Sequence, residues 1–205
     1  MDKKIRILAA GDLHGDIAQA EKLAKKAEDE NVDLIILTGD ITHFGGSAEG
    51  LIGPLVKRNK KVFLIPGNHE NVETINLLTD TYSVKNLHGY YAILGDVAFF
   101  GCGGATKVGP VLRLDEEEVK YLLGRSHKKI KDFKRKIMIT HEHPTGSIID
   151  KLIPNSGSKS IREAVDKFKP DFVLCGHIHE AAGIEEKIGL TTVINVGKAG
   201  KIIEL

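Results

Sequence analysis

The sequence predicts a four-layer α/β fold, in which two mixed β-sheets pack as a sandwich flanked by helices. The first observation is an alternation of short apolar runs with segments of helical periodicity, which is typical of strand–helix–strand units around a largely parallel sheet. The second is a pair of glycine-containing turns between adjacent apolar runs, which predict hairpins and therefore antiparallel strands. The third is the length of 205 residues, which is enough for two such sheets in a single domain over residues 1–205.

Five apolar runs predict the central strands, and a polar turn follows each of them directly. The runs cover residues 5–10, 32–38, 61–65, 136–140 and 171–175. They are rich in Ile, Val, Leu and Phe, which is typical of strands buried inside a sheet.

Four amphipathic segments between these runs predict helices. Their apolar stripes are Ile17, Ala20, Leu23 and Ala27; Val72, Ile75 and Leu78; Val119, Leu122, Leu123 and Ile130; and Ile161, Ala164, Val165 and Phe168. Asp115 with Glu118 predicts the start of the third helix. Ser160 with Glu163 predicts a capping box at the start of the fourth.

Two pairs of apolar runs predict hairpins. Residues 90–94 and 97–101 are separated by Gly95 and Asp96, a dipeptide that favours a tight turn. Residues 191–196 and 201–205 flank Gly197 and Gly200 and predict the second hairpin. Antiparallel strands therefore join the parallel ones, and both sheets are expected to be mixed.

Composition excludes several classes of protein. The net charge is +1, with 29 Lys and Arg against 28 Asp and Glu, which gives no electrostatic case for nucleic acid or a membrane surface as partner. Two cysteines cannot form a disulfide framework or a four-thiolate zinc site. No apolar run approaches the about 18 residues of a membrane span, so we expect a cytoplasmic protein with no membrane partner.

Histidines gather directly after the predicted strands, where seven of the nine in the chain occur. The five turns carry Asp12 and His14; Asp40 and His43; Asn68, His69 and Glu70; His141 and His143; and His177 and His179. Ligand sites of open α/β sheets form at the carboxyl ends of strands, so these turns are expected to converge. Imidazole and carboxylate groups without thiolate suit Mn, Fe, Zn, Ni or Mg.

Local spacing supports a metal site in these turns. Asp12 and His14 are two residues apart, as are His177 and His179, so each pair points to one side of an extended chain. A glycine precedes Asp12, Asp40, Asn68 and His177, and it permits a tight turn and close approach of the backbone.

The five turns contain, in order, Asp-x-His, Gly-Asp, Gly-Asn-His-Glu, His and Gly-His-x-His, from Asp12 to His179. In this pattern the sequence resembles the calcineurin-like metallophosphoesterases. The segment 39–45 lacks the second Asp and the Arg of the Gly-Asp-x-x-Asp-Arg-Gly motif of protein Ser/Thr phosphatases. The chain is therefore more similar to the short prokaryotic branch, the Icc-like phosphoesterases. The resemblance implies the fold of that family, a sandwich of two mixed sheets flanked by helices.

The resemblance also implies a site for two divalent metal ions, drawn from Mn, Fe, Ni, Zn and Mg. It assigns Asp12, His14 and His179 to the first ion, Asn68, His141 and His177 to the second, and Asp40 to both. Such ions lie about 3.5–4 Å apart and lower the pKa of a bound water, whose hydroxide attacks phosphorus. His69 would bind no metal; it would contact the phosphate and assist the leaving oxygen.

Three residues adjoin the motifs without an assigned role, namely His43, Glu70 and His143. They are candidates to contact the substrate or to support the ligands, and either Glu70 or His43 could orient His69. The remaining histidines are expected outside the site, His88 in a turn and His127 on a solvated surface.

We therefore expect a dinuclear metal-dependent phosphoesterase that hydrolyses a small phosphomonoester or phosphodiester. One alternative is a nuclease acting on DNA or RNA ends, which the near-neutral charge does not favour. The other is a non-catalytic metal-binding scaffold like the retromer subunit of this superfamily, in which the catalytic His is replaced, whereas His69 is present here. Substrate choice is expected in loops 44–50, 101–114 and 145–157, and an oligomer is compatible with the sequence.

Overall fold

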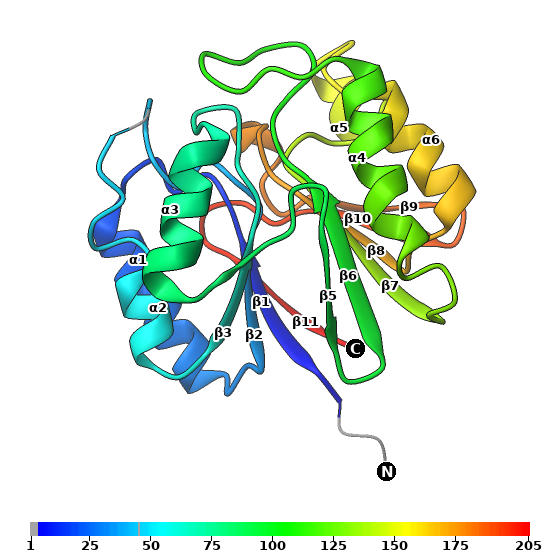
Figure 1. Ribbon diagram of the computed structural model, residues 1–205. Helices are drawn as coiled ribbons and strands as arrows, with labels where there is room; N and C mark the ends of the chain where they lie inside the picture. Colours follow the sequence, from blue (N-terminus) through cyan, green and yellow to red (C-terminus); the bar gives the residue numbers. More distant parts are fainter. Residues whose placement is uncertain (1–3, 45) are drawn as a thin grey trace.

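The computed structural model describes residues 4–44 and 46–205 and contains two β-sheets packed face to face (Figure 1). The first sheet has the order β11 (Lys201–Glu204), β1 (Arg6–Ala10), β2 (Leu34–Leu37), β3 (Lys61–Leu64) and β4 (Lys85–Asn86). The second has the order β5 (Tyr91–Leu94), β6 (Val97–Cys102), β7 (Arg135–Thr140), β8 (Phe172–Cys175), β10 (Thr191–Asn195) and β9 (Glu185–Ile188).

Helices cover the outer sides of this sandwich (Figure 1). Beside the first sheet lie α1 (Ile17–Asp29), α2 (Gly53–Lys57) and α3 (Val72–Tyr82). Beside the second lie α4 (Glu116–Lys128), α5 (Ile148–Leu152) and α6 (Lys159–Phe168). Both sheets are mixed, because β11, β5 and β9 pair antiparallel at sheet edges while the inner strands pair in parallel. The predicted four-layer fold is confirmed.

The side chains of strand β1 pack into two different apolar clusters, one on each face of the sheet. Leu8 and Ala10 belong to the apolar cluster under α1, α2 and α3, whereas Ile7 and Ala9 belong to the cluster between the two sheets. All four side chains are buried. Successive residues of a strand point to opposite faces, so a continuous apolar run is what a strand covered on both faces requires.

The first predicted hairpin is present, and the second is wrong. β5 and β6 pair antiparallel across Gly95 and Asp96. Strand β10, however, pairs with β8 and β9 in one sheet, while β11 pairs with β1 in the other. The connection between β10 and β11 crosses between the sheets, with left-handed backbone at Gly197 (φ +60°) and Gly200 (φ +70°). The strand that pairs antiparallel with β10 is β9. Because β9 is charged and half-exposed, its sequence does not have the apolar pattern of a strand.

One helix start also differs from expectation. The capping box of α4 is present, with Asp115 and Glu118 bonding each other's backbone N–H at 2.8 Å. The predicted capping box at Ser160 is wrong, because α6 is capped by Ser158, whose Oγ accepts from Ile161 N. The carboxylate of Glu116 accepts hydrogen bonds from Ser158 Oγ and from Ser160 N, so a contact between helices sets where α6 begins.

His127 is not the solvated residue that its lysine neighbours suggest. Its ring stacks on Phe168 with 4.0 Å between ring centroids and 9° between the planes. This contact joins α4 to α6, so the residue has a packing role.

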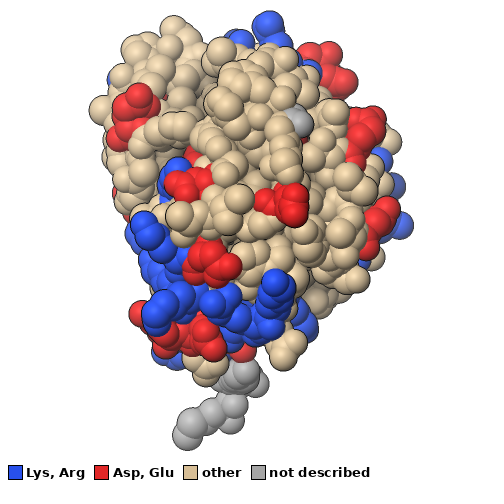
Figure 2. All heavy atoms as spheres, turned by 90° about the vertical axis from the view of Figure 1, so that its left-hand side faces the viewer, with Lys and Arg blue, Asp and Glu red and all other residues tan. Residues whose placement is uncertain are grey.

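Charges of both signs mix on the side formed by α1 and α2. Figure 2 shows Lys and Arg gathering at the lower end of this side, with Asp and Glu among them. Ion pairs of these helices include Lys25 with Asp29 at 2.6 Å and Arg58 with Glu28 at 3.1 Å. Within the described part of the chain, no helix has the length and apolar character needed to cross a membrane.

Candidate metal centre

The turns that follow β1, β2, β3, β7 and β8 meet at one end of the sandwich, so both sheets contribute to the site. From the first turn, Asp12 and His14 meet His179, and one possible ligand atom of each lies within 4.8 Å of the others. His14 Nε2 is 3.1 Å from His179 Nε2, and His179 Nε2 is 3.8 Å from Asp12 Oδ1. We name these three residues group A.

A second group forms beside it from the turns after β2, β3, β7 and β8. Asp40, His141 and His177 offer ligand atoms within 4.8 Å of one another. Asn68 joins them, because its Oδ1 lies 2.8 Å from His141 Nε2 and 2.9 Å from His177 Nδ1. We name these four residues group B.

Asp40 lies between the two groups. Its Oδ2 is 3.6 Å from His14 Nε2 in group A and 3.4 Å from His141 Nε2 in group B. The carboxylate is buried, with 3% of the side chain exposed. One oxygen therefore faces both groups, which is the position that a bridging ligand occupies.

The distances between histidine nitrogens in the two groups match those between the ligands of one metal ion. His14 Nε2 and His179 Nε2 are 3.1 Å apart, and His177 Nδ1 and His141 Nε2 are 3.2 Å apart. Nitrogens bound at about 2.0–2.1 Å to one tetrahedral ion lie about 3.3 Å apart, which is close to these separations. The donor set of imidazoles, carboxylates and one amide oxygen therefore suits two divalent ions, with no thiolate among the described residues of either group.

Hydrogen bonds from the surrounding backbone orient the candidate ligands. His141 Nδ1 lies 2.8 Å from Thr38 O, so this nitrogen carries the proton and Nε2 is left to bind a metal. Asp12 Oδ1 accepts from His177 N at 3.1 Å, and Asp40 Oδ1 accepts from His69 N at 3.0 Å. The second oxygen of Asp40, Oδ2, remains available to a metal, whereas Asp12 Oδ1 is also the oxygen that faces His179.

The backbone of the site is held in an uncommon conformation. Asp12, His14, Asp40 and His177 have φ angles of +58°, +49°, +50° and +69°. Residues other than glycine seldom adopt this left-handed region, although Asp and His do so more often than most. Such backbone is concentrated at functional sites, where the surrounding structure enforces it.

Charges within the site shift the pKa values of its residues in opposite directions. Burial alone would raise the pKa of Asp40, but the charge and hydrogen bond of His141, together with the backbone N–H and charge of His69, hold the pKa well below its ordinary value. Burial alone would lower the pKa of His141, yet Asp40 raises it to about 9. Burial lowers the pKa of His14 to about 4 and that of His177 to about 3, which favours the neutral imidazoles that bind metals.

Glu70 supports the turns and does not orient His69. The side chain is fully buried, and its oxygens accept hydrogen bonds from Asp40 N at 3.0 Å and from Thr42 N and Gly67 N at 2.7 Å each. In the described part of the chain, none of its hydrogen bonds goes to the His69 ring. Glu70 therefore ties the turn after β2 to the turn after β3.

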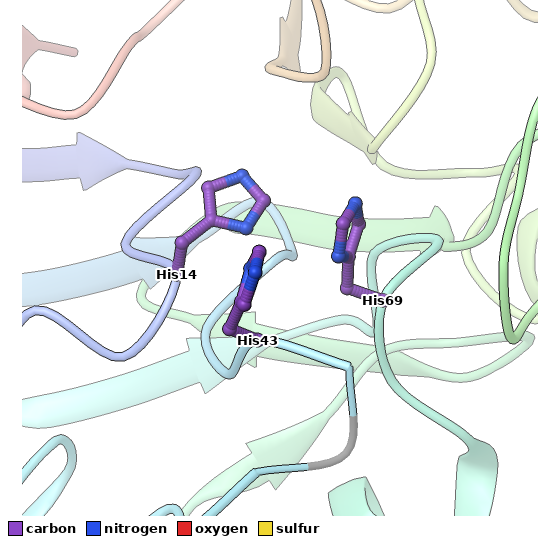
Figure 3. Close-up of side chains that lie close together, drawn as sticks. All are labelled: His14, His43 and His69. Carbon is purple, nitrogen blue, oxygen red and sulfur yellow. The ribbon is translucent and has the colours of Figure 1, made fainter.

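His69 lies beside Asp40 but belongs to neither group. Its Nε2 is 3.8 Å from Asp40 Oδ2, and 16% of its side chain is exposed. Burial lowers its pKa. Of the two candidates to orient His69, His43 and Glu70, it is His43 that lies beside its ring (Figure 3). The two rings are stacked, with 5.5 Å between their centroids and 22° between their planes.

Phe44 is a contact of His69 that the sequence interpretation missed. The Phe44 ring lies 4.6 Å from that of His69 and 4.3 Å from that of His43, although 58% of Phe44 is exposed. The only signal in the sequence is its place directly after His43, within a loop already expected to select the substrate.

His143 lies outside both groups. It is fully buried, and its Nε2 is 3.1 Å from Ser156 Oγ, within the loop that follows β7. Its neighbour Glu142 was not predicted and is also buried; it accepts hydrogen bonds from Thr106 N and Thr106 Oγ1. Burial raises the pKa of Glu142 to about 7. Glu142 thus fastens the 101–114 loop beside the site.

Comparisons with known proteins identify the family of this chain. The model of the calcineurin-like phosphoesterase family matches residues 5–181. An uncharacterised protein of Methanocaldococcus jannaschii is 32% identical over an alignment of 205 positions, which covers 95% of this chain and 89% of that protein. A probable cyclic nucleotide phosphodiesterase of Vesicomyosocius okutanii is 28% identical over 169 residues, covering 79% of this chain and 69% of the other.

A solved structure shows the same fold. The protein TT1561 of Thermus thermophilus superposes with a TM-score of 0.80 over 96% of this chain and 91% of its own, at 19% identity. At that identity the likeness concerns the fold alone. The family match spans most of the chain, from β1 to the turn that carries His177 and His179. This chain belongs to the calcineurin-like phosphoesterase family.

Proposed function

We propose that this protein is a dinuclear metal-dependent phosphoesterase that hydrolyses P–O bonds of a small phosphomonoester or phosphodiester. The observation that carries the proposal is the place of Asp40, whose Oδ2 lies 3.6 Å from His14 Nε2 and 3.4 Å from His141 Nε2. A carboxylate oxygen between two sets of imidazoles is suited to bridge two cations. Membership of the phosphoesterase family supports the same activity.

Two bound divalent ions would activate a water molecule and offset the negative charge that develops on the phosphoryl oxygens. Asp12, His14 and His179 would hold the first ion; Asn68, His141 and His177 the second; and Asp40 both. These ligands accept Mn, Fe, Ni, Zn or Mg, and Mn²⁺ is the ion we would test first.

His69 is proposed as the catalytic residue. It stands beside Asp40 without a place in either group, so its ring is free to contact a phosphate held there. Its role would be to bind a phosphoryl oxygen and to protonate the leaving oxygen. Burial lowers its pKa, and the negative charge of a bound phosphate acts in the opposite direction and favours the protonated ring. General acid catalysis of this kind contributes roughly 10²–10⁴-fold.

The other residues of the site have supporting roles in this proposal. Glu70 and the backbone N–H of His69 fix the position of Asp40. His43 and Phe44 cover one side of His69 and would contact the part of the substrate that leaves. His143 supports the loop after β7 through Ser156.

A small substrate is favoured over nucleic acid. On the face shown in Figure 2, Lys and Arg gather at the lower end, whereas the carboxyl ends of the parallel strands lie at the upper end in Figure 1. The net charge of +1 does not provide the broad positive surface that nucleases use for phosphate contacts. Because the chain is similar to a probable cyclic nucleotide phosphodiesterase, we would include cyclic nucleotides among the first substrates tested.

The proposal is tested with purified protein, Mn²⁺ and two chromogenic substrates, bis(4-nitrophenyl) phosphate and 4-nitrophenyl phosphate. We expect metal-dependent hydrolysis that the variant Asp40→Ala abolishes. A screen of phosphorylated metabolites, cyclic nucleotides and oligonucleotides with Mn²⁺, Ni²⁺, Zn²⁺ and Mg²⁺ then identifies the substrate class. Hydrolysis that persists unchanged in Asp40→Ala would contradict the proposal.

A further inference from the structure

His43 forms a third group of potential ligands with His69 and with His14, which this group shares with group A. Each ring offers one nitrogen, and the three nitrogens lie within 4.8 Å of one another. The ring centroids of His14 and His69 are 4.7 Å apart, and His43 lies 5.5 Å from each. Figure 3 shows the three rings converging from separate turns. We name this set the histidine triad.

Two nitrogens of the triad are buried and make no hydrogen bond to the described residues. His14 Nδ1 and His69 Nδ1 are inaccessible to solvent and have no hydrogen-bond partner among residues 4–44 and 46–205. In His14 it is the opposite nitrogen, Nε2, that faces His179 at 3.1 Å and Asp40 at 3.6 Å. Buried polar atoms are seldom left without a partner, so a ligand that binds these nitrogens explains their arrangement.

The surroundings of the triad suit a cation bound by ring nitrogens. Phe44 covers one side, with its ring 4.3 Å from that of His43 and 4.6 Å from that of His69. The carboxylate of Asp40 lies near the Nε2 atoms, 3.8 Å from that of His69. The Nδ1 atoms of His14 and His69 are thus free of the hydrogen bonds that would compete with a metal.

We propose that His14, His43 and His69 form a third metal site, which binds Zn²⁺ or Ni²⁺ in preference to Mn²⁺ or Mg²⁺. Three imidazoles with an open fourth position are an established zinc arrangement. Imidazole ligands bind Zn²⁺ and Ni²⁺ more tightly than Mn²⁺, and Mg²⁺ prefers oxygen. A tetrahedral ion needs nitrogens about 3.3 Å apart, and the exposed His43 ring is the member that can move inward to provide this spacing.

An ion in the triad would inhibit the enzyme, and this consequence rests on the proposed function. It would occupy His69 and so remove the group proposed to protonate the leaving oxygen. It would also bind His14 through Nδ1, and the proton on that nitrogen would be released to solvent. We therefore infer that excess Zn²⁺ inhibits Mn²⁺-supported hydrolysis through His43-dependent binding.

The binding experiment does not depend on catalysis. Protein loaded with Mn²⁺ is dialysed against increasing Zn²⁺, and the metals bound per chain are counted by mass spectrometry. We expect the wild type to bind one Zn²⁺ more than His43→Gln, while His127→Gln, which removes a histidine outside the site, keeps the wild-type number. The variant His43→Cys retains a zinc ligand and should keep the additional ion. Equal Zn²⁺ binding by the wild type and His43→Gln would overturn the proposal.

The position of the ion is checked by nitrogen NMR of the histidine rings, with diamagnetic Mg²⁺ in place of paramagnetic Mn²⁺, which would broaden these signals. Binding in the triad should shift the Nδ1 signals of His14 and His69 in the wild type and in His127→Gln, but not in His43→Gln. Zinc that replaces Mg²⁺ in groups A and B would give the same signals in all three proteins. Shifts that do not depend on His43 would count against the third site.

Inhibition is measured for each protein relative to its own activity with Mn²⁺. Removal of one of the three ligands should raise the Zn²⁺ concentration for half-inhibition at least roughly tenfold in His43→Gln and leave it unchanged in His127→Gln. If the wild type shows no Mn²⁺-dependent hydrolysis, the proposed function fails, and the Zn²⁺ count alone decides the third site. If hydrolysis is present but inhibition is identical in His43→Gln, the third site fails and the proposed function stands.

Discussion

The buried carboxylate of Glu70 fixes the backbone of Asp40, whose N–H donates to Glu70 Oε2 at 3.0 Å. The same oxygen accepts from Gly67 N at 2.7 Å, and Oε1 accepts from Thr42 N at 2.7 Å. One side chain therefore sets the distance between the turn that carries Asp40 and the turn that leads to Asn68. The separation of the two groups of ligands depends on this link.

The variant Glu70→Gln should weaken both the fold and the metal site. A Gln side chain directs one N–H₂ group toward backbone donors, so at least one buried N–H loses its acceptor. We expect the free energy of unfolding to fall by about 2 kcal/mol and the affinity for Mn²⁺ to fall roughly 10–100-fold. Urea unfolding and calorimetric titration with Mn²⁺ measure the two effects. Glu73→Gln, at an exposed position in the first turn of α3, is the matched control and should change neither.

Gly67 leaves room for Asp40. A Cβ at position 67 would lie 1.9 Å from Asp40 Oδ1 and 2.2 Å from Asp40 N, so Gly67→Ala must displace the carboxylate. We expect this variant to lose Mn²⁺-dependent hydrolysis and at least one bound Mn²⁺ per chain. Gly124 offers the control, because a Cβ there meets nothing within 4 Å and the residue lies within α4. Gly124→Ala should keep full activity and raise the free energy of unfolding by about 1 kcal/mol. Equal activity in the two variants would show that the site tolerates a shift of Asp40.

Loss of His69 should separate catalysis from metal binding. His69 is proposed to protonate the leaving group and is not among the proposed ligands of groups A and B. We expect His69→Gln to lower kcat roughly 10²–10⁴-fold while the number of Mn²⁺ ions per chain stays that of the wild type. Steady-state kinetics and mass spectrometry of the metals give the two values. An unchanged kcat would favour the metal-binding scaffold or another proton donor.

His88 gives the fold a pH dependence that is independent of the metal site. Burial and the charge of Arg125 lower its pKa from 6.5 to about 4, so between these values the unfolded chain binds a proton that the folded chain excludes. Stability therefore falls as the pH falls through this window, by about 2 kcal/mol from His88 between about pH 7 and about pH 5.

The variant His88→Asn tests this contribution in metal-free protein. Gly103 N donates to His88 Nδ1 at 3.0 Å, and the Oδ1 of Asn can accept the same hydrogen bond without titrating. Urea unfolding of both proteins at the two pH values should show a smaller loss of stability in the variant. Equal losses would mean that His88 is protonated in the folded protein at about pH 5.

Local sequence patterns predicted the parts of the fold that local burial determines. The five central strands lie within one or two residues of their predicted bounds; the run 5–10, for example, contains β1 (Arg6–Ala10). Such strands are buried on both faces, so their apolar pattern is continuous and easy to recognise. Partner choice at the sheet edges was not predicted, because β10 and β11 are neighbours in the chain but pair in different sheets.

In the site, too, local sequence patterns predicted some features, whereas others depend on tertiary packing. The residues that carry the motifs follow strands directly, so parallel strand packing was enough to predict that their turns lie together. Phe44 and the Glu142–Thr106 contact were not predicted. They depend on loops whose course is set by tertiary packing, and Thr106 lies 36 residues before Glu142 in the chain. Likewise, nothing in the motif Gly-Asn-His-Glu shows that Glu70 turns away from His69 toward three backbone N–H groups.

The place of Asp40 between two metal ions is tested most directly by anomalous diffraction from crystals grown with Mn²⁺. We expect two peaks about 3.5–4 Å apart on either side of Asp40 Oδ2, one next to Asp12 and His179 and the other next to His141 and His177. A single peak, or peaks that do not share the carboxylate of Asp40, would contradict the bridging role of this residue.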